Sequence, residues 1–455
     1  MINVRFLQVK NSIISSLTKH ITSTFLTQFP VLILTFASGV IITRLIGAEG
    51  KGIYAIFTAN TQLLALFLSV SANSGLTYYL SNKFISERKI IGLSIITLLF
   101  ASVVGVLAIF IPFNQDSLLF PNNFNTFSFK CYLFLCFFFT VLNTLFLGIF
   151  QGYKFYILLN KISIINAIIN VLFFGVFLLD SSITIFGSKL FDVLLITLII
   201  YALNTLINGW FYSKVIKLRP DFNVKFKEEF MTFLRYIGIG HLSNMLNFLN
   251  YRMDIWFVNS YQGAEQLGLY SLAVSFSQML LMLSAPIATV LFPYLVEETN
   301  KLKKISLVGL LSRINTFSLI IGAFFMFFTS EFIIPTIYGQ EFINSIPSFK
   351  IMIFATIFMG LTKIFASYLA SEDKVSYNLY ATIIGFIITF SLNTYLVPKI
   401  GIVGASITSL VTYFSIFAFV FYKTLKLNNS MRLNFFIPNL VDYKMLKTII
   451  SSGKK

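Results

Sequence analysis

Charged residues are scarce in this chain of 455 residues. They make up 11% of the sequence, whereas soluble domains carry about 25%. Hydrophobic residues reach 57% and aromatic residues 17%, and the mean hydropathy is +0.83. This composition excludes a soluble globular domain and indicates a membrane protein.

Histidine and cysteine are almost absent. The two histidines, His20 and His241, cannot form an H-E-x-x-H motif or a histidine cluster around a metal. The two cysteines, Cys131 and Cys136, lie on different faces of one predicted helix, so we expect no disulfide. No G-x-x-x-x-G-K-[ST] motif is present either. We therefore predict a protein that is not an enzyme, with no catalytic residues, no metal and no cofactor beyond a possible H⁺ or Na⁺ coupling ion.

Long apolar segments fill most of the chain. Eight windows contain no Asp, Glu, Lys or Arg: 21–43, 52–82, 90–115, 131–153, 193–213, 266–296, 375–398 and 400–422. Four more contain or adjoin a charge: 156–179, 236–258, 305–329 and 347–371. A spanning helix needs roughly 20 apolar residues, and these continuous runs exclude the alternating pattern of a membrane β-barrel. We predict an all-α polytopic membrane protein with about twelve transmembrane helices.

The basic residues predict the orientation of the chain. With the N-terminus inside, the inner segments hold 23 Lys and Arg residues, and the outer loops and helix ends hold six. Because cytoplasmic loops carry the excess of Lys and Arg, we predict that both termini are cytoplasmic. The basic blocks are short loops between spans rather than an extended patch, so we expect no nucleic-acid partner.

The longest inner loop divides the chain into two sets of six spans. We predict an N-terminal six-helix bundle (1–213), a cytoplasmic linker (214–230), a C-terminal six-helix bundle (231–424) and a basic cytoplasmic tail (425–455). The stretch GAEGKGIY (47–54) follows the first span, and a near copy, GAEQLGLY (263–270), follows the seventh. Because an even number of spans returns the chain to its starting side, the second half enters the membrane from the same side as the first. The two halves are therefore expected to be parallel repeats.

Both copies of this motif are interpreted as turns rather than ligand sites. Glycine permits a tight turn between two long helices. Glu49 and Glu265 suit the first turn of the following helix, where the positive end of the helix dipole lies. We place both turns on the outer side of the membrane.

Two stretches resemble a known family. RLIGAEGKGIYAIF (44–57) and KIGIVGASITSLVTYF (399–414) are similar to segments of bacterial polysaccharide flippases of the multidrug/oligosaccharidyl-lipid/polysaccharide exporter superfamily. The resemblance covers nearly the whole chain. It implies two bundles around a central cavity and alternating access. It also implies transport of undecaprenyl-diphosphate-linked oligosaccharide repeat units, as for O-antigen or capsule, to the outer leaflet of the bacterial cytoplasmic membrane. Membrane lipids and other polysaccharide-assembly proteins are the further partners implied.

The seventh span has a polar face. At 100° per residue, one half of its surface carries His241, Ser243, Asn244, Asn247, Asn250, Tyr251 and Asp254. The opposite half is apolar. We interpret the polar face as the lining of a water-filled cavity, and the alternative is a polar contact between helices.

Ionisable residues inside spans are costly and usually functional. Asp254 either pairs with Arg252 or binds a coupling H⁺ or Na⁺, and the sequence leaves both open. Lys363 lies deep in the tenth span, and Lys161 lies near the inner end of the fifth and could extend to the surface. For the cargo that the resemblance implies, Lys363, Arg252 and Lys161 are the candidate ligands of the diphosphate.

Two other functions were weighed. A multidrug cation antiporter of the same superfamily would favour acidic cavity residues, whereas three of the four candidate intramembrane charges are basic. A polysaccharide polymerase or glycosyltransferase typically needs a sizeable loop for its catalytic residues, and the outer loops here are all shorter than about 20 residues. The flippase is therefore the leading hypothesis.

Overall fold

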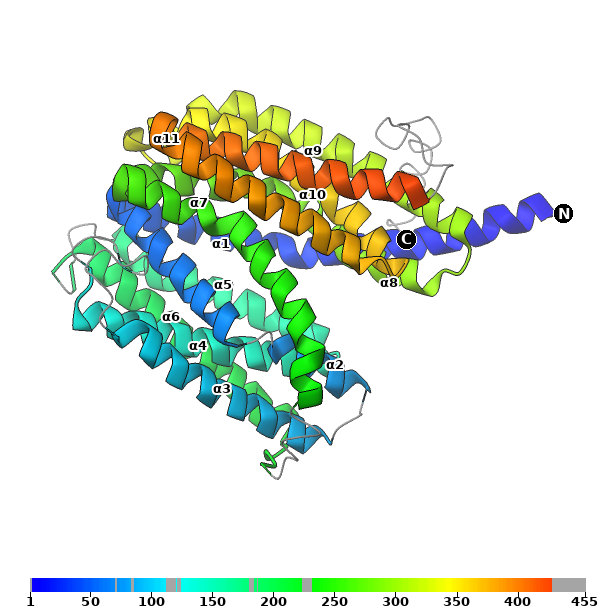
Figure 1. Ribbon diagram of the computed structural model, residues 1–455, viewed down its shortest axis with the longest axis horizontal. Helices are drawn as coiled ribbons and strands as arrows, with labels where there is room; N and C mark the ends of the chain where they lie inside the picture. Colours follow the sequence, from blue (N-terminus) through cyan, green and yellow to red (C-terminus); the bar gives the residue numbers. More distant parts are fainter. Residues whose placement is uncertain are drawn as a thin grey trace. The chain divides into compact units, whose positions relative to one another are not determined.

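The computed structural model describes residues 2–69, 72–82, 86–111, 120, 124–179, 184, 185, 187–222 and 231–427 (Figure 1). For residues 2–25, 72, 74, 78, 81, 82, 178, 179 and 231–240 it describes the backbone alone. The α-helices are α1 (Ile2–Leu68), α2 (Ala72–Asn82), α3 (Glu87–Phe110), α4 (Phe127–Gly152), α5 (Tyr156–Leu179), α6 (Lys189–Val215), α7 (Met231–Gln278), α8 (Ala285–Glu297), α9 (Lys301–Ile337), α10 (Ile346–Ser371) and α11 (Val375–Leu427). Two short 3₁₀ helices, η2 (Met279–Met282) and η3 (Gln340–Ser345), precede α8 and α10. The described chain is thus all-α, as predicted.

Three of the longest helices contain a break at a glycine. The backbone angles are φ 65°, ψ −172° at Gly47 in α1 and φ 80°, ψ 177° at Gly263 in α7. Gly401 in α11 also has a positive φ, of 60°. Only glycine adopts the conformation of Gly47 and Gly263 readily. Because these two residues begin the two copies of the repeated motif, the interpretation of the motif as a turn is confirmed.

The chain reverses at two of these breaks. Asp254 and Tyr270 lie on either side of Gly263, and in an unbroken helix they would be about 24 Å apart. Instead, the Tyr270 hydroxyl donates a hydrogen bond to the Asp254 carboxylate. In α11, the hydroxyls of Thr389 and Thr412 are 2.9 Å apart across the break at Gly401. The parts of α7 and of α11 before and after each break therefore lie side by side.

The described helices are long and apolar enough for a multi-pass membrane protein. Eight of them pass a test of length and composition for crossing a membrane, and the broken pair His241–Met282 and Ala285–Glu297 makes nine. Some of these candidates, such as Leu26–Leu68 with 43 residues, contain a break. The polytopic membrane class is confirmed, and the number of twelve spans stays a prediction.

The chain forms two compact units. The N-terminal unit comprises residues 30–271, and the C-terminal unit comprises residues 1–29 and 272–455. The divisions therefore fall between Phe29 and Pro30, inside α1, and between Ser271 and Leu272, inside α7. The predicted boundaries at 213/214, 230/231 and 424/425 stay predictions. Residues 223–230 of the predicted linker and 428–455 of the predicted tail lie outside the described residues.

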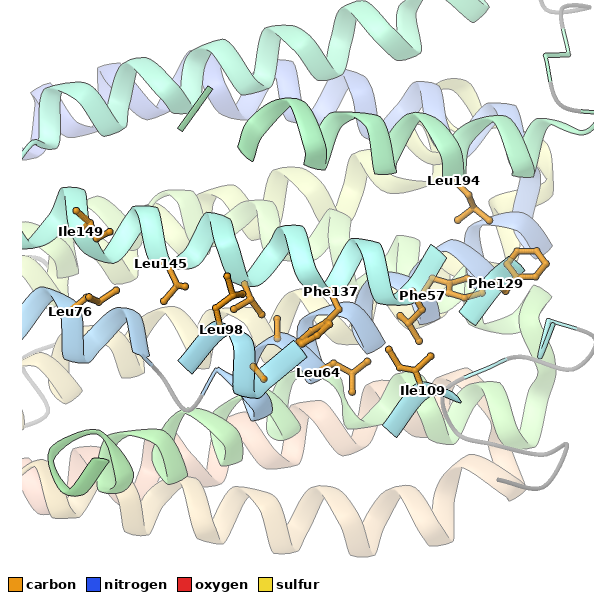
Figure 2. Close-up of a cluster of buried hydrophobic side chains, with 14 of the residues drawn as sticks. Phe57, Leu64, Leu76, Leu98, Ile109, Phe129, Phe137, Leu145, Ile149 and Leu194 are labelled. Atoms are coloured by element: carbon orange, nitrogen blue, oxygen red, sulfur yellow. The ribbon is translucent and has the colours of Figure 1, made fainter. Parts of the chain in front are cut away.

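The N-terminal unit is packed around a large aromatic and aliphatic cluster. Phe57 lies at one end of it, with its ring stacked on that of Phe129 at 5.6 Å between centroids. Figure 2 shows Leu76, Leu98, Phe137, Leu145 and Leu194 within the same cluster, which joins α1, α2, α3, α4 and α6. These buried side chains fix the helices of this unit against one another.

The C-terminal unit has polar contacts between its helices. Asn315 on α9 is fully buried; its Nδ2 donates to the Gly360 carbonyl on α10 at 3.3 Å, and its Oδ1 accepts from Ser284 at 2.8 Å. Lys304, near the start of α9, forms an ion pair with Glu372 at 2.8 Å, just after α10. Figure 1 shows α9, α10 and α11 running alongside one another in this unit. Amide side chains often join membrane helices in this way.

Candidate functional site

Asp254 is the acid at the centre of the candidate site. Its side chain is 4% exposed, and its carboxylate accepts hydrogen bonds from the Tyr270 hydroxyl and from the Ile255 backbone N–H, the latter at 3.0 Å. Tyr270 is fully buried and is the last residue of the second motif copy. Hydrogen bonds to a carboxylate are among the strong ones in proteins. The bond therefore ties the segment before Gly263 to the segment after it.

Arg252 does not form an ion pair with Asp254. Its guanidinium is half-buried and makes no ion pair or hydrogen bond with any residue in the described part of the chain. Tyr270, which the sequence analysis did not single out, occupies the position beside the carboxylate.

The other predicted polar residues of α7 differ in burial. Asn250 lies one turn before Asp254 and is 3% exposed, so both belong to the same buried face. His241, Asn247 and Tyr251 are half-buried, and Asn244 is exposed. The cavity that this face was expected to line stays a prediction.

A second hydrogen bond attaches α7 to α1. The Trp256 indole Nε1 donates to the Asn60 side-chain oxygen at 2.7 Å, and both side chains are buried. Trp256 lies on the half of α7 that was assigned to apolar packing. The sequence signal was present, because a buried indole N–H normally finds a partner, but its partner is 196 positions away.

The remaining candidate cations lie on other helices. Lys363 is in α10, within the C-terminal unit, and is half-buried. Its ammonium group makes no ion pair or hydrogen bond with the residues that the structure describes. Lys161 is exposed on α5, within the N-terminal unit. The structure thus groups Arg252, Asp254 and the polar residues of α7 on one helix and leaves Lys161 and Lys363 elsewhere.

Some buried polar pairs were missed by the sequence analysis. Asn208 on α6 donates to Asn143 on α4 at 2.8 Å. In α11, Asn393 and Thr408 are fully buried on opposite sides of the break at Gly401. Asn393 lies four residues after Thr389 and Thr408 lies four residues before Thr412, the two residues that are hydrogen-bonded across the break. For the residues of α11, the sequence did carry a signal, because polar residues recur on both sides of Gly401.

Residues 17–298, more than half of the chain, match the model of a family described as polysaccharide biosynthesis protein. The chain is also 24% identical, over 227 residues, to an uncharacterized membrane protein of Methanocaldococcus jannaschii. That alignment covers 49% of this chain and 44% of the relative, so the chain spans less than half the length of this curated relative.

Solved transporter structures share the fold. An inward-facing multidrug resistance transporter of the MATE family, in the MOP superfamily, matches with a TM-score of 0.67 at 12% identity, covering 88% of this chain and 96% of that one. The lipid II flippase MurJ, in an inward closed conformation, matches with a TM-score of 0.67 at 14% identity, covering 92% and 91%. At these identities the likeness shows the fold alone. The resemblance of the motif at 44–57 agrees with the family model, which matches residues 17–298.

Proposed function

Because the chain belongs to the polysaccharide biosynthesis protein family, we propose that it is a flippase for lipid-linked oligosaccharides. Its cargo would be undecaprenyl-diphosphate-linked repeat units, moved from the inner to the outer leaflet of a bacterial cytoplasmic membrane. Alternating access between the two halves provides the route. An H⁺ or Na⁺ gradient, or the membrane potential, drives turnover.

The observation that carries this proposal is Lys363. A lysine inside a spanning helix is costly, by up to about 2.5–3.5 kcal/mol at the helix centre on insertion scales, and no described side chain offsets that cost by pairing with Lys363. A diphosphate headgroup faces its own desolvation cost of many kcal/mol on entering the bilayer core. A fixed ammonium lowers that cost through charge-assisted contacts. The positive charge of the lysine would therefore stabilise the diphosphate in the membrane, and the negative charge of the diphosphate would stabilise the lysine.

Export of cationic drugs is the second candidate, and the shared fold of the MATE transporter supports it. Cationic cargo requires an accessible acid. Among the described residues, the buried acids are Asp192 and Asp254. The Asp192 carboxylate accepts from the Ile185 N–H at 3.0 Å, and Asp254 accepts from Tyr270. Since both acids already have donors within the protein, this arrangement favours anionic cargo.

The experiment that tests the proposal compares lysine variants in cells that lack their own flippase. We expect Lys363→Ala to reduce surface polysaccharide at least tenfold, a change of about 1.4 kcal/mol. Lys363→Arg should retain part of the function because it keeps the charge. Lys161→Ala, which removes an exposed lysine, is the matched control and should stay within about twofold of the unmodified protein. Normal export by a well-expressed Lys363→Ala protein would show that the headgroup is held elsewhere, and Arg252 would be tested next.

A further inference from the structure

The segment that follows α6 folds back against the N-terminal unit. α6 ends at Val215, and Lys217 has a left-handed backbone conformation, with a φ of 56°. A left-handed residue just after the last turn commonly ends a helix. The Lys217 N–H donates to the Tyr212 carbonyl at 3.3 Å, and the Tyr212 hydroxyl donates to the Leu218 carbonyl at 2.7 Å. The chain after the helix is therefore held beside the last turn of α6.

The same segment is also attached to α3. The Asp221 N–H donates to the carbonyl of Arg88, in the first turn of α3, at 3.0 Å. A Cβ atom built on Gly92 would lie 2.1 Å from the Asp221 carbonyl oxygen, so any side chain at this position would push the segment away. These residues all belong to the N-terminal unit. Residues 216–222, which we call the strap, are thus fixed to α6 at Leu218 and to α3 at Asp221.

The strap and the last turn of α6 expose three cations. Lys214, Lys217 and Arg219 are exposed, whereas Asp221, the acid in this stretch, is half-buried. Among the residues that the structure describes, none forms an ion pair or hydrogen bond with the side chain of Lys217 or Arg219. The Lys214 ammonium lies over the Trp210 ring, 4.6 Å from its centroid. Acids in the described part of the chain therefore do not neutralise this surface.

Large apolar side chains lie beside these cations in the chain. Trp210 is 54% exposed and Phe222 is 56% exposed. Trp210 lies in the last two turns of α6, which is long and apolar enough to cross a membrane. Tryptophan is enriched where spanning helices meet the lipid headgroups, and a lysine there can lay its stem on apolar surface while its charge stays in water. The end of α6 and the strap are therefore expected at the headgroup level, on the side that the basic residues identify as inner.

Charge and position together indicate the partner. The stretch 214–227 contains five Lys and Arg residues and one acid. About four to eight basic residues directly after a spanning helix, on its inner side, are typical of segments that bind anionic lipids. We propose that Lys214, Lys217 and Arg219, held by the strap together with Trp210, bind the headgroup of an anionic phospholipid in the inner leaflet. This binding depends neither on the cargo nor on the proposed flippase activity.

Two other occupants fit this surface less well. A zwitterionic headgroup carries its own cation beside its phosphate, so its net charge is zero and the three cations gain little from it. An acidic protein would match the charge, but it would not bring acyl chains to Trp210 and Phe222. An anionic phospholipid supplies both a phosphate for the cations and an apolar chain for the aromatic rings. The observations therefore favour a lipid over a protein.

The fluorescence of Trp210 tests the proposal directly. The chain has two tryptophans, and the other, Trp256, is buried and bonded to Asn60. The full protein is placed in vesicles of equal parts phosphatidylglycerol and phosphatidylcholine, with one of the two lipids brominated near its headgroup. The quenching that disappears in Trp210→Phe is due to Trp210. Since one cation near an anionic surface gives a preference of about fivefold, we expect brominated phosphatidylglycerol to quench Trp210 at least about threefold more strongly.

Replacing the three cations should remove this preference. Lys214→Gln/Lys217→Gln/Arg219→Gln keeps long side chains without charge, so the two brominated lipids should quench Trp210 equally. The preference should also weaken when salt is raised to about 1 M, because the Debye length falls to about 3 Å. The matched control removes three exposed cations of the C-terminal unit and should keep the preference: Lys301→Gln, Lys374→Gln and Lys426→Gln.

A glycine variant tests whether the strap builds the site. Gly92→Ala moves the strap away from α3 but keeps every charge, so we expect it to weaken the preference for phosphatidylglycerol. Gly39→Ala is the control, because a Cβ there meets nothing within 4 Å. An unmodified protein without the preference would overturn the proposal, and the surface would then fit an acidic protein instead. A folded triple variant that retains the preference, or a folded Gly92→Ala protein with the full preference, would also overturn it.

Discussion

At the scale of single residues, the hydrogen bond from Tyr270 to Asp254 bears on whether this buried acid can bind a coupling ion. If Asp254 binds the coupling ion, Asp254→Asn should abolish ion-dependent transport while binding of the lipid-linked oligosaccharide stays measurable. Tyr270→Phe removes one of the two donors and should destabilise the fold by about 1–3 kcal/mol, because one oxygen of a buried carboxylate loses its partner. The double variant should be no worse than Asp254→Asn, since the two groups act as a unit. Gradient-driven transport and cargo binding in vesicles measure these effects.

Two control variants test whether these effects are specific to the Tyr270–Asp254 bond. Tyr261→Phe removes an exposed hydroxyl from the same helix and should change nothing. Adding Arg252→Gln to Asp254→Asn should not recover transport, because no ion pair joins the two residues. Recovery by that double variant would restore Arg252 as the partner, and full transport by Asp254→Asn under every gradient would remove Asp254 from coupling.

The partner of Asp254 shows why residue-level prediction is incomplete. Asp254 could be singled out from the sequence because an acid inside a span is rare. Arg252 is close in sequence, but residues two apart on a helix do not face each other. Tyr270 reaches the carboxylate only because the chain reverses at Gly263. To predict this bond, one would need the geometry of the turn at Gly263 and the alignment of the α7 segments before and after it. That alignment is set by tertiary packing.

At the scale of elements, orientation follows from the distribution of basic residues. Reporter fusions after Asn125, between α3 and α4, and after Asn344, within η3, should give outside signals. A fusion after Asp221 should give an inside signal; this residue follows α6, and its N–H donates to the Arg88 carbonyl at 3.0 Å. A reversed signal at any of the three positions would contradict the arrangement of two parallel halves.

Helix positions were largely predictable, whereas helix pairing was not. The window 156–179 coincides with α5, and the window 347–371 begins one residue after α10 does. Apolar runs of this length have no alternative in a membrane, where every backbone group must be bonded internally. In contrast, the bonds between Trp256 and Asn60 and between Asn208 and Asn143 depend on how separate helices align. Local sequence does not encode that alignment.

At the scale of the whole molecule, sequence symmetry and packing divide the chain differently. The predicted repeats place the boundary within 214–230, because six predicted spans lie on each side. The contacts instead place residues up to Ser271 with the N-terminal unit. The reasons are visible at two points, where Trp256 bonds to Asn60 and where Ala264 and Gly268 pack on Gly52 and Ala48. The first part of α7 is thus attached to α1, although the sequence assigns it to the second predicted repeat.

The central claim is that the chain moves a diphosphate-linked oligosaccharide across a membrane. A transfer assay in vesicles tests this claim most directly. Purified protein is placed in vesicles with labelled undecaprenyl-diphosphate-linked oligosaccharide, and the label that reaches the opposite leaflet is followed under an imposed H⁺ or Na⁺ gradient or membrane potential. We expect transfer that depends on the protein, slows at least tenfold in Lys363→Ala and is partly kept in Lys363→Arg. Transport of a cationic drug by the same vesicles, with the lipid-linked oligosaccharide left in its original leaflet, would contradict the account.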